Sequence, residues 1–145
     1  MGNINLIKPE KVSLKDHPDL NEVSERIVKA RLAGKHVIWM IGAHVVKRGL
    51  SPLLIDLMER GVITHLALNG AAALHDIEIA REGRTSEDVE ANLQSGSFGM
   101  VDETGDFMNA AMREGARRGE GLGECWGRAL CEAVPPHAGA SLFVQ

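Results

Sequence analysis

The organisation of the chain follows from one stretch, Val62-Ile-Thr-His-Leu-Ala-Leu-Asn-Gly-Ala-Ala-Ala-Leu-His-Asp-Ile-Glu-Ile79. It opens as a short apolar run, breaks at Asn69-Gly70, and resumes as a helical pattern of small residues. A strand that leads through a small-residue turn into a helix is typical of α/β proteins, which bind ligands at the carboxyl edge of the sheet. Small residues let a ligand approach the backbone, and a helix N-terminus offers unpaired N–H groups to an anion. The stretch therefore predicts where a ligand would sit.

A second strand is predicted upstream, at His36–Ile41, where the residues are almost continuously apolar. Such a run suits a parallel strand that is buried on both faces. Val45–Leu50 then reads as a connecting loop, and Ser51-Pro52 as an N-cap followed by proline at the first helical position. Because a crossover of this length requires parallel strands, residues 36–79 are expected to form one βαβ unit.

The remainder of the chain is expected to be mainly helical. Residues 1–15 read as an N-terminal arm, and Pro18 begins a helix that Gly34 ends. Residues 85–134 form a helical part that a capping box opens at Thr85-Ser-Glu-Asp88, and residues 135–145 form a tail. We therefore expect a single α/β domain with a Rossmann-like parallel sheet. Only two strands are clear, so the chain is either part of a longer protein or its sheet is completed by a partner.

Composition narrows the class of protein. The 145 residues are enough for one buried core, while the net charge of −4 and the 3% aromatic content argue against a nucleic-acid-binding surface. No apolar run approaches the ~20 residues of a membrane span, and no signal peptide is visible, so a cytoplasmic protein is expected. Cys125 and Cys131 lie six residues apart on a predicted helix and point in different directions, which makes a disulfide between them implausible.

Two turns carry the candidate binding residues. The first is Gly42-Ala-His-Val-Val-Lys-Arg-Gly49, which has two glycines and a lysine but matches neither the Walker A nor the G-x-G-x-x-G pattern. The second is Asn69-Gly-Ala-Ala-Ala73, and neighbouring parallel strands place both turns at one edge of the sheet. We expect a nucleotide there, although an ordinary loop with a surface lysine is the alternative to a phosphate cradle. The residues expected to contact the ligand are Gly42, Ala43, His44, Lys47, Ser51, Asn69, Gly70 and Ala71.

Three polar residues follow the second turn, at His75, Asp76 and Glu78. His75 and Glu78 are three residues apart and share a helix face, while Asp76 points elsewhere. A histidine beside a carboxylate suits acid–base catalysis or a divalent metal, but the spacing matches no zinc signature. A metal-assisted hydrolase using His44, His75 and Asp76 is one alternative. A solvated first turn, whose acids complement the helix dipole, is another.

A family resemblance is carried by the serine-headed helix start at Ser51 and by the residues from Met58 to Glu78, M-E-R-G-V-I-T-H-L-A-L-N-G-A-A-A-L-H-D-I-E. Over roughly Gly42 to Ile79 the sequence resembles the NAD-binding region of deoxyhypusine synthase and its bacterial relatives. In that family a serine-headed helix, a strand, an alanine-glycine turn and an acidic helix start follow in this order. The resemblance implies a Rossmann-like fold with bound NAD, usually in a homotetramer with its sites at subunit interfaces.

The resemblance also implies a reaction. The family transfers the aminobutyl group of spermidine to a lysine of a translation factor, or to another amine, with NAD as a transient hydride acceptor. By this likeness Asp76 and Glu78 bind an amine or ribose hydroxyls, and His75 carries a proton. The family's late catalytic lysine is not found in this sequence, so the chain is expected to be the N-terminal portion of a longer relative or a divergent member. A non-catalytic nucleotide-binding or assembly module is the alternative.

Overall fold

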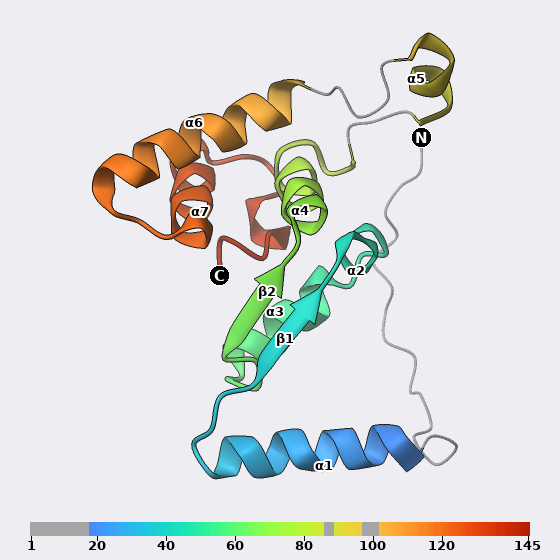
Figure 1. Ribbon diagram of the computed structural model, residues 1–145, viewed down its shortest axis with the longest axis vertical. Coiled ribbons are helices and arrows are strands. Elements are labelled where there is room, and N and C mark those ends of the chain that lie inside the picture. The colour runs from blue at the N-terminus through green and yellow to red at the C-terminus, as the bar shows by residue number, and fades with distance from the viewer. Residues whose placement is uncertain (1–17, 86–88, 97–101) are drawn as a thin grey trace.

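The computed structural model describes residues 18–85, 89–96 and 102–145. Two strands, β1 (Ile38–Ile41) and β2 (His65–Leu68), pair in parallel to form a two-stranded sheet, so the chain is of the α/β class (Figure 1). Within the described ranges there is no further strand, and helices dominate. The helices are α1 (Pro18–Leu32), α2 (Ala43–Lys47), α3 (Ser51–Glu59), α4 (Gly70–Glu82), α5 (Val89–Ser95), α6 (Asp102–Arg118), α7 (Leu122–Ala133) and the 3-10 turn η2 (Ala138–Ala140).

The predicted βαβ unit is present, with α2 and α3 in the crossover between the strands. Ile38 is opposite His65 and Ile41 is opposite Leu68, so both strands end level with each other. The strands are shorter than predicted. Val37, just before β1, meets Thr64 through both backbone and side chain, and its carbonyl accepts from the N–H groups of Thr64 and His65 at 3.1 and 3.3 Å. The Val37 N–H donates to Thr64 Oγ1 at 2.8 Å, and this hydroxyl donates to the Val37 carbonyl at 3.1 Å.

The segment after β1 was expected to be a loop, and this prediction is wrong. Residues Ala43–Lys47 form the helix α2, which packs against α4 and buries Val46 to 1% exposure. Tertiary burial of Val46 here outweighs the weak helix propensity of the two adjacent valines. The prediction of Ser51 as an N-cap is also wrong, because Leu50 already has helical backbone angles. Ser51 is the first residue of α3, buried, and its side chain makes no capping hydrogen bond.

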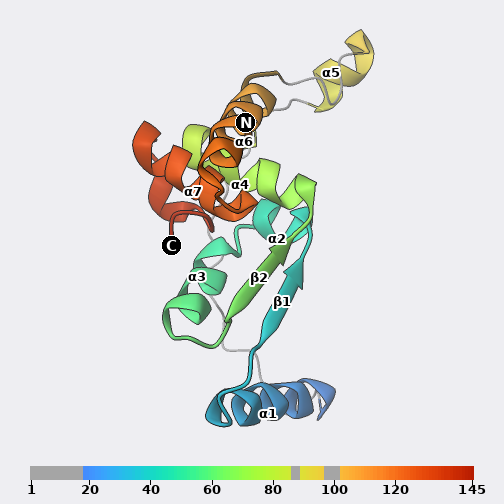
Figure 2. The ribbon, with the colours of Figure 1, turned by 60° about the vertical axis from the view of Figure 1, so that its left-hand side comes forward.

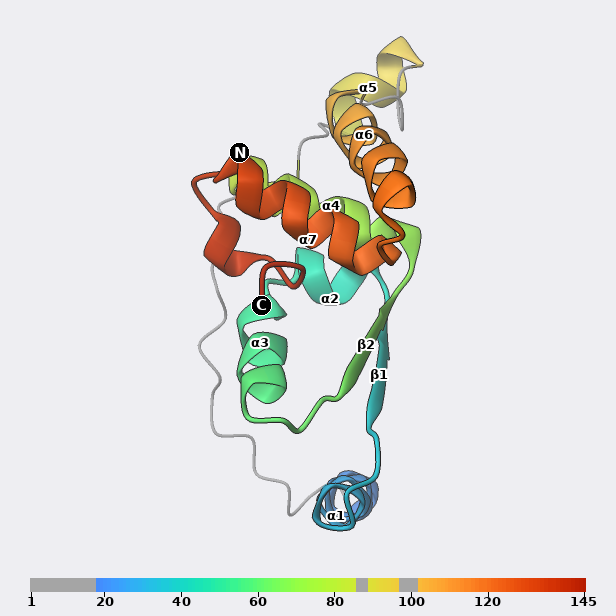
Figure 3. The same ribbon diagram turned by 90° about the vertical axis from the view of Figure 1, so that its left-hand side faces the viewer.

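The two faces of the sheet differ, contrary to the expectation that β1 is buried on both. Trp39, Ile41, Leu66 and Leu68 pack towards the core that includes Leu54 of α3. On the opposite face Ile38 is 63% exposed and Met40 is 79% exposed. Figure 3 shows α3 on one side of the strands and no described element across the other. A two-stranded sheet with helices on one side cannot bury both faces.

The helix α4 organises the rest of the molecule, because two apolar clusters meet on it. Figure 2 shows α4 beside α6 and α7, above the carboxyl ends of the strands. Ala72 faces the cluster of the sheet, α2 and α3, whereas Ala73 and Ile77 face the cluster of α6 and α7. Both helices lie in the part expected to be helical, and the residues that they bury include Thr104, Ala111, Gly115, Cys125, Trp126 and Leu130. Both cysteines are free, as their spacing predicts.

The segment 135–145 is not a loose tail but part of the core. It turns through η2, returns towards the sheet, and buries Ser141 and Leu142. Its backbone lies so close to α7 that a Cβ at Gly127 would stand 2.3 Å from the Phe143 carbonyl oxygen. Trp126 also meets the Phe143 ring edge-on, with centroids 5.4 Å apart. The sequence of this segment, which is short and lacks periodicity, gave no sign of these contacts.

The N-terminal part of the described chain is the helix α1, which begins at Pro18 as predicted and is followed by Gly34 at φ +66°. It lies beyond the amino ends of the strands and stands apart from the other helices (Figure 1). The expected arm at 1–15 lies outside the described residues, as does most of the capping box at Thr85-Ser-Glu-Asp88. In the part of the chain that the structure describes, no helix has the length and apolar character needed to cross a membrane.

Candidate functional site

The two predicted turns meet at the carboxyl edge of the sheet. Gly42 follows Ile41 and Asn69 follows Leu68, and these two strand residues are direct partners in the register. The Asn69 N–H donates to the Ile41 carbonyl at 3.4 Å. A Cβ built on Gly42 would lie 3.5 Å from Asn69 Nδ2, which is an ordinary contact distance. Parallel pairing requires the two turns to meet at one edge of the sheet, and this prediction is confirmed for Gly42 and Asn69.

Asn69 is the N-cap of α4 and fixes the start of that helix. Its Oδ1 accepts from the Ala72 N–H at 2.9 Å, and its own carbonyl accepts from the Ala73 N–H at 3.1 Å. The first N–H groups of a helix have no partner within the helix, and those of Gly70 and Ala71 precede the two that Asn69 satisfies. Both residues are exposed, and no atom lies within 4 Å of a Cβ built on Gly70. The edge therefore offers backbone donors and free space to a ligand, together with the positive end of the helix dipole.

A pocket of about 200 Å³ opens beside these turns. One side is formed by β2 and the start of α4, through Leu66, Leu68, Asn69, Gly70 and Ala73. The other side is formed by the start of α7 and by the tail, through Leu122, Gly123, Trp126 and Phe143. The lining is mainly apolar, and the N-termini of two helices border it. Such a pocket suits a flat apolar group that is joined to an anionic one.

The contribution of α7 and the tail to this pocket was not predicted. Leu122 and Phe143 are more than fifty residues from Asn69 in the sequence, so only the tertiary fold brings them there. The run Gly119-Glu-Gly-Leu-Gly123 lies between α6 and α7. It is one more glycine-rich turn before a helix, and the Gly121 N–H donates to Glu124 Oε2 at 3.4 Å at its start. The likeness of this run to the turn before α4 is a feature of the sequence from which this side of the pocket could have been predicted.

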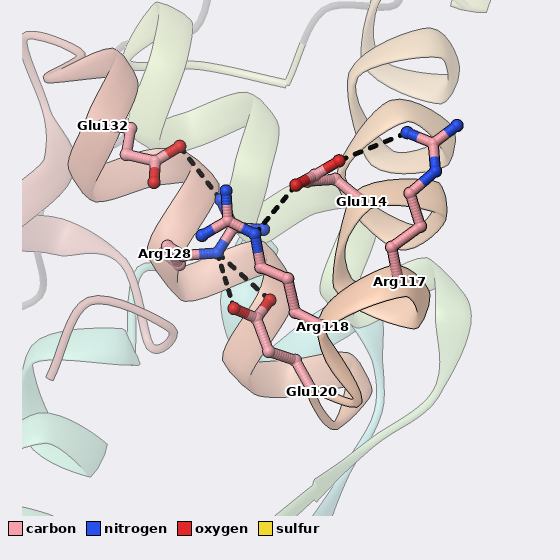
Figure 4. Close-up of polar contacts among 6 residues, drawn as sticks. All are labelled: Glu114, Arg117, Arg118, Glu120, Arg128 and Glu132. Carbon is pink, nitrogen blue, oxygen red and sulfur yellow. Dashed lines mark hydrogen bonds and ion pairs between the residues drawn. The ribbon is translucent and has the colours of Figure 1, made fainter.

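The turn before α7 is held in place by charged side chains (Figure 4). Arg128 Nε donates to both carboxylate oxygens of Glu120, at 2.8 and 3.1 Å, and Arg128 Nη1 donates to Glu132 at 2.9 Å. These two carboxylates raise the pKa of Arg128 further, so the guanidinium stays charged at any accessible pH. Arg117 and Arg118 pair with Glu114 on the exposed face of α6, as expected of a solvated helix face.

His75 and Glu78 form the predicted pair on one face of α4. His75 Nδ1 lies 2.8 Å from Glu78 Oε2, and their side chains are 20% and 2% exposed. A buried carboxylate fixes the ring orientation and leaves the other ring nitrogen to act on a partner. The pair lies more than one helical turn along α4 from Asn69, and neither residue lines the 200 Å³ pocket.

Asp76 lies on another face of α4 and holds the tail. Ser141 Oγ donates to Asp76 Oδ2 at 2.6 Å, and the Leu142 N–H donates to both carboxylate oxygens at 3.0 Å. The carboxylate is only 1% exposed, and this burial raises the pKa of Asp76 more than the hydrogen bonds from Ser141, Leu142 and Phe143 lower it. Asp76 therefore joins two distant segments of the chain and is not open to a small ligand.

The remaining predicted residues lie along the crossover. Ala43 is the first residue of α2, and His44 and Lys47 are exposed on that helix, three positions apart. His44, His75 and Asp76 do not form the ligand set of the hydrolase alternative. Among the residues that the structure describes, no three His, Cys, Asp or Glu side chains are grouped to hold a metal ion.

Comparison of the chain with models of protein families, with curated proteins and with solved structures finds no match in any of the three.

Proposed function

We propose that the protein binds an NAD-type dinucleotide at the carboxyl edge of β1 and β2, in the manner of a Rossmann-like site. The supporting observation is that the turns at Gly42 and Asn69 lie side by side, and that the Asn69 turn borders a pocket between β2, α4 and α7. In open α/β sheets this edge is the position where nucleotides bind. The resemblance of residues 42–79 to an NAD-binding region is independent of that geometry.

Each part of the edge has a role in this proposal. The N–H groups of Gly70 and Ala71 donate to the ligand phosphate, assisted by the dipole of α4. The apolar pocket at Leu68 and Trp126 accommodates one ring of the ligand. The glycine at position 42 and the small Ala43 admit the ligand close to the backbone, while Lys47 on α2 adds positive charge and the His44 ring adds a hydrogen-bonding group. Asn69 fixes the start of α4, whereas Ser51, expected to contact the ligand, is buried at the start of α3.

The reaction that we propose is transfer of an aminobutyl group from a polyamine to an amine acceptor. NAD, when bound, supplies the hydride acceptor for this chemistry. The protein must also move a proton, because an amine acts as a nucleophile only in its neutral form. His75 takes that role, and Glu78 orients the ring through the 2.8 Å contact. Asp76 is assigned no ligand, since its carboxylate is engaged by Ser141 and Leu142.

The binding step is tested by a thermal shift with NAD, in the presence and absence of spermidine. A ligand at about 100 times its dissociation constant stabilises a protein by about 2.7 kcal/mol, which raises Tm by several degrees. Gly42→Ala with Gly70→Ala puts two methyl groups at the edge without a steric clash in the protein itself. We expect this variant to lose the shift and keep its Tm. The matched control is Gly105→Ala on α6, which also meets no atom within 4 Å.

The catalytic step is tested with His75→Gln, which should keep the NAD shift and lose turnover of polyamine and acceptor. Absence of an NAD shift in the folded wild type would exclude NAD binding by this chain alone. An NAD shift without turnover on any amine would instead identify a non-catalytic nucleotide-binding module.

A further inference from the structure

A second cleft, of about 290 Å³, adjoins the pocket beside Asn69. The pocket and the cleft share the part of their lining that comes from β2, from the start of α7 and from the tail: Leu66, Leu68, Gly123 and Phe143. Leu66 and Leu68 are two residues apart on β2, so this shared wall extends about 7 Å along the strand. A ligand that fills the pocket can therefore continue into the second cleft.

The second cleft differs from the pocket in its polar groups. Glu124 and Gln145 line only the second cleft, and the described residues that line the two include no lysine or arginine. Glu124 is exposed, and its carboxylate accepts from the Gly121 N–H at 3.4 Å, which is a long hydrogen bond. A carboxylate has about four acceptor positions on its two oxygens, so Glu124 keeps most of its capacity for a ligand.

Arg128, the basic residue of α7, does not neutralise Glu124. Its guanidinium is held by Glu120 at 2.8 Å and by Glu132 at 2.9 Å (Figure 4). Three carboxylates and one guanidinium leave an excess of negative charge on this part of the molecule. A carboxylate beside apolar walls also attracts a cation more strongly than one surrounded by water, because such surroundings screen the charge less.

We propose that the second cleft binds the ammonium group of a primary alkyl amine, with Glu124 as its carboxylate partner. The ammonium donates to Glu124 in a charge-assisted hydrogen bond. The methylene chain of the amine lies against Leu66, Leu142 and Phe143, which line the same cleft. A cleft with one carboxylate, apolar walls and no basic group selects such an amine against an anion or an uncharged chain of the same length.

This inference deepens the proposed function, and it rests on that function for the role of the amine as a substrate. The amine then lies next to the pocket assigned to one ring of the dinucleotide. Recognition of the amine moves from α4 to α7, because the two carboxylates of α4 are engaged elsewhere. Asp76 holds Ser141 and the tail, and Glu78 contacts His75.

The test is calorimetric titration of the whole chain, without NAD, with butane-1,4-diamine and with butane-1,4-diol. The two probes have the same carbon chain, and only the diamine is charged at neutral pH. The wild type should bind the diamine at least about tenfold more tightly than the diol, and Glu124→Gln should remove that preference. Glu124→Lys should weaken diamine binding further than Glu124→Gln, because like charges repel.

The matched control is Glu132→Gln, which removes the same charge from a 61% exposed side chain of α7 that does not line the cleft. It should leave diamine binding unchanged. Equal weakening by Glu124→Gln and Glu132→Gln would assign the effect to the overall charge of α7 and overturn the proposal. So would a folded wild type that binds the diamine no better than the diol, or a Glu124→Gln variant that binds it at the wild-type strength.

Two sources of the amine are compared with spermidine and with Nα-acetyl-lysine methylamide, which carries a lysine side chain. Binding of either through Glu124 supports the site, and the tighter of the two identifies its occupant as a polyamine or as a lysine. The NAD thermal shift is read separately. Diamine binding through Glu124 without an NAD shift retains the amine site and overturns the nucleotide site. An NAD shift with diamine binding that does not depend on Glu124 overturns the amine site alone.

Discussion

The part of the molecule built from α4, α6, α7 and the tail differs from the part built from α1 and the sheet. In the first, Ile77 and Leu130 are fully buried, and backbone segments approach so closely that only glycine fits at Gly115 and Gly127. In the second, Met40 and Leu32 are 79% and 85% exposed. The first part is closed by contacts within the chain, whereas the second presents apolar surface outward. Substitutions of the same kind should therefore have different effects in the two parts.

The largest expected difference is between two truncations of apolar side chains. Leu130→Ala removes a fully buried side chain between α4 and α7 and should lower the free energy of unfolding by about 2–5 kcal/mol. Met40→Ala on the open face of the sheet should change it by less than about 0.5 kcal/mol in dilute solution. Urea unfolding of both variants measures the difference. Equal losses would contradict the division of the molecule into a closed and an open part.

The next effect concerns the contact between α7 and the tail. Gly127→Ala places a methyl group against the Phe143 carbonyl oxygen and should destabilise the fold by about 1–3 kcal/mol through overpacking. Gly105→Ala, on α6 in open space, should instead be neutral or stabilising by up to about 1 kcal/mol, because alanine favours a helix. Thermal unfolding of the pair compares them directly. A neutral Gly127→Ala would mean that the tail does not pack on α7.

A pH dependence tests the attachment of the tail to α4. Burial raises the pKa of Asp76 in the folded state above its ordinary value of 3.8. At pH values between the ordinary pKa and the raised one, the folded state therefore binds more protons than the unfolded state. The contribution of Asp76 to stability therefore falls as the pH rises through this window and is constant above it. Asp76→Asn removes the titration. The unfolding free energy of the wild type minus that of the variant should thus decrease with rising pH, and an increase would contradict the raised pKa.

The smallest expected effect compares two arginines. Arg26 on α1 forms an exposed pair with Glu22, and Arg26→Met should cost less than about 1 kcal/mol. Arg128 in the closed part joins Glu120 and Glu132, and its Nη2 is buried. Arg128→Met should lower Tm more than Arg26→Met does, because it leaves the nearly buried Glu120 without its partner. Differential scanning calorimetry of both variants checks the order.

The turns of the site were predictable, while the pocket beside them was not. The position of Asn69-Gly70 after an apolar run, and of Gly42 after another, already implied a shared edge, because parallel strands leave no other arrangement. The pocket needs Trp126 and Phe143, whose places depend on the packing of α7 and of the tail on α4. No local sequence pattern predicts that packing, because the contacts join residues that are far apart in the chain.

The roles of individual polar residues were likewise predictable only in part from the sequence. Spacing alone placed His75 and Glu78 on one helix face, and they are in contact at 2.8 Å. Spacing also separated Asp76 from them, but it gave no indication that this carboxylate holds Ser141 and Leu142, sixty-five residues later. The helix at Ala43–Lys47 was missed for a related reason, because burial of Val46 against α4 decided it.

The sequence by itself determined the βαβ unit, the meeting of the two turns and the shared helix face of His75 and Glu78. These follow from short-range periodicity and from the geometry of a parallel crossover, both of which lie within a few tens of residues. Only the tertiary structure decided which face of the sheet is covered, where the tail binds and which side chains line the pocket. Those features depend on contacts between distant segments, whose burial outweighs local preference.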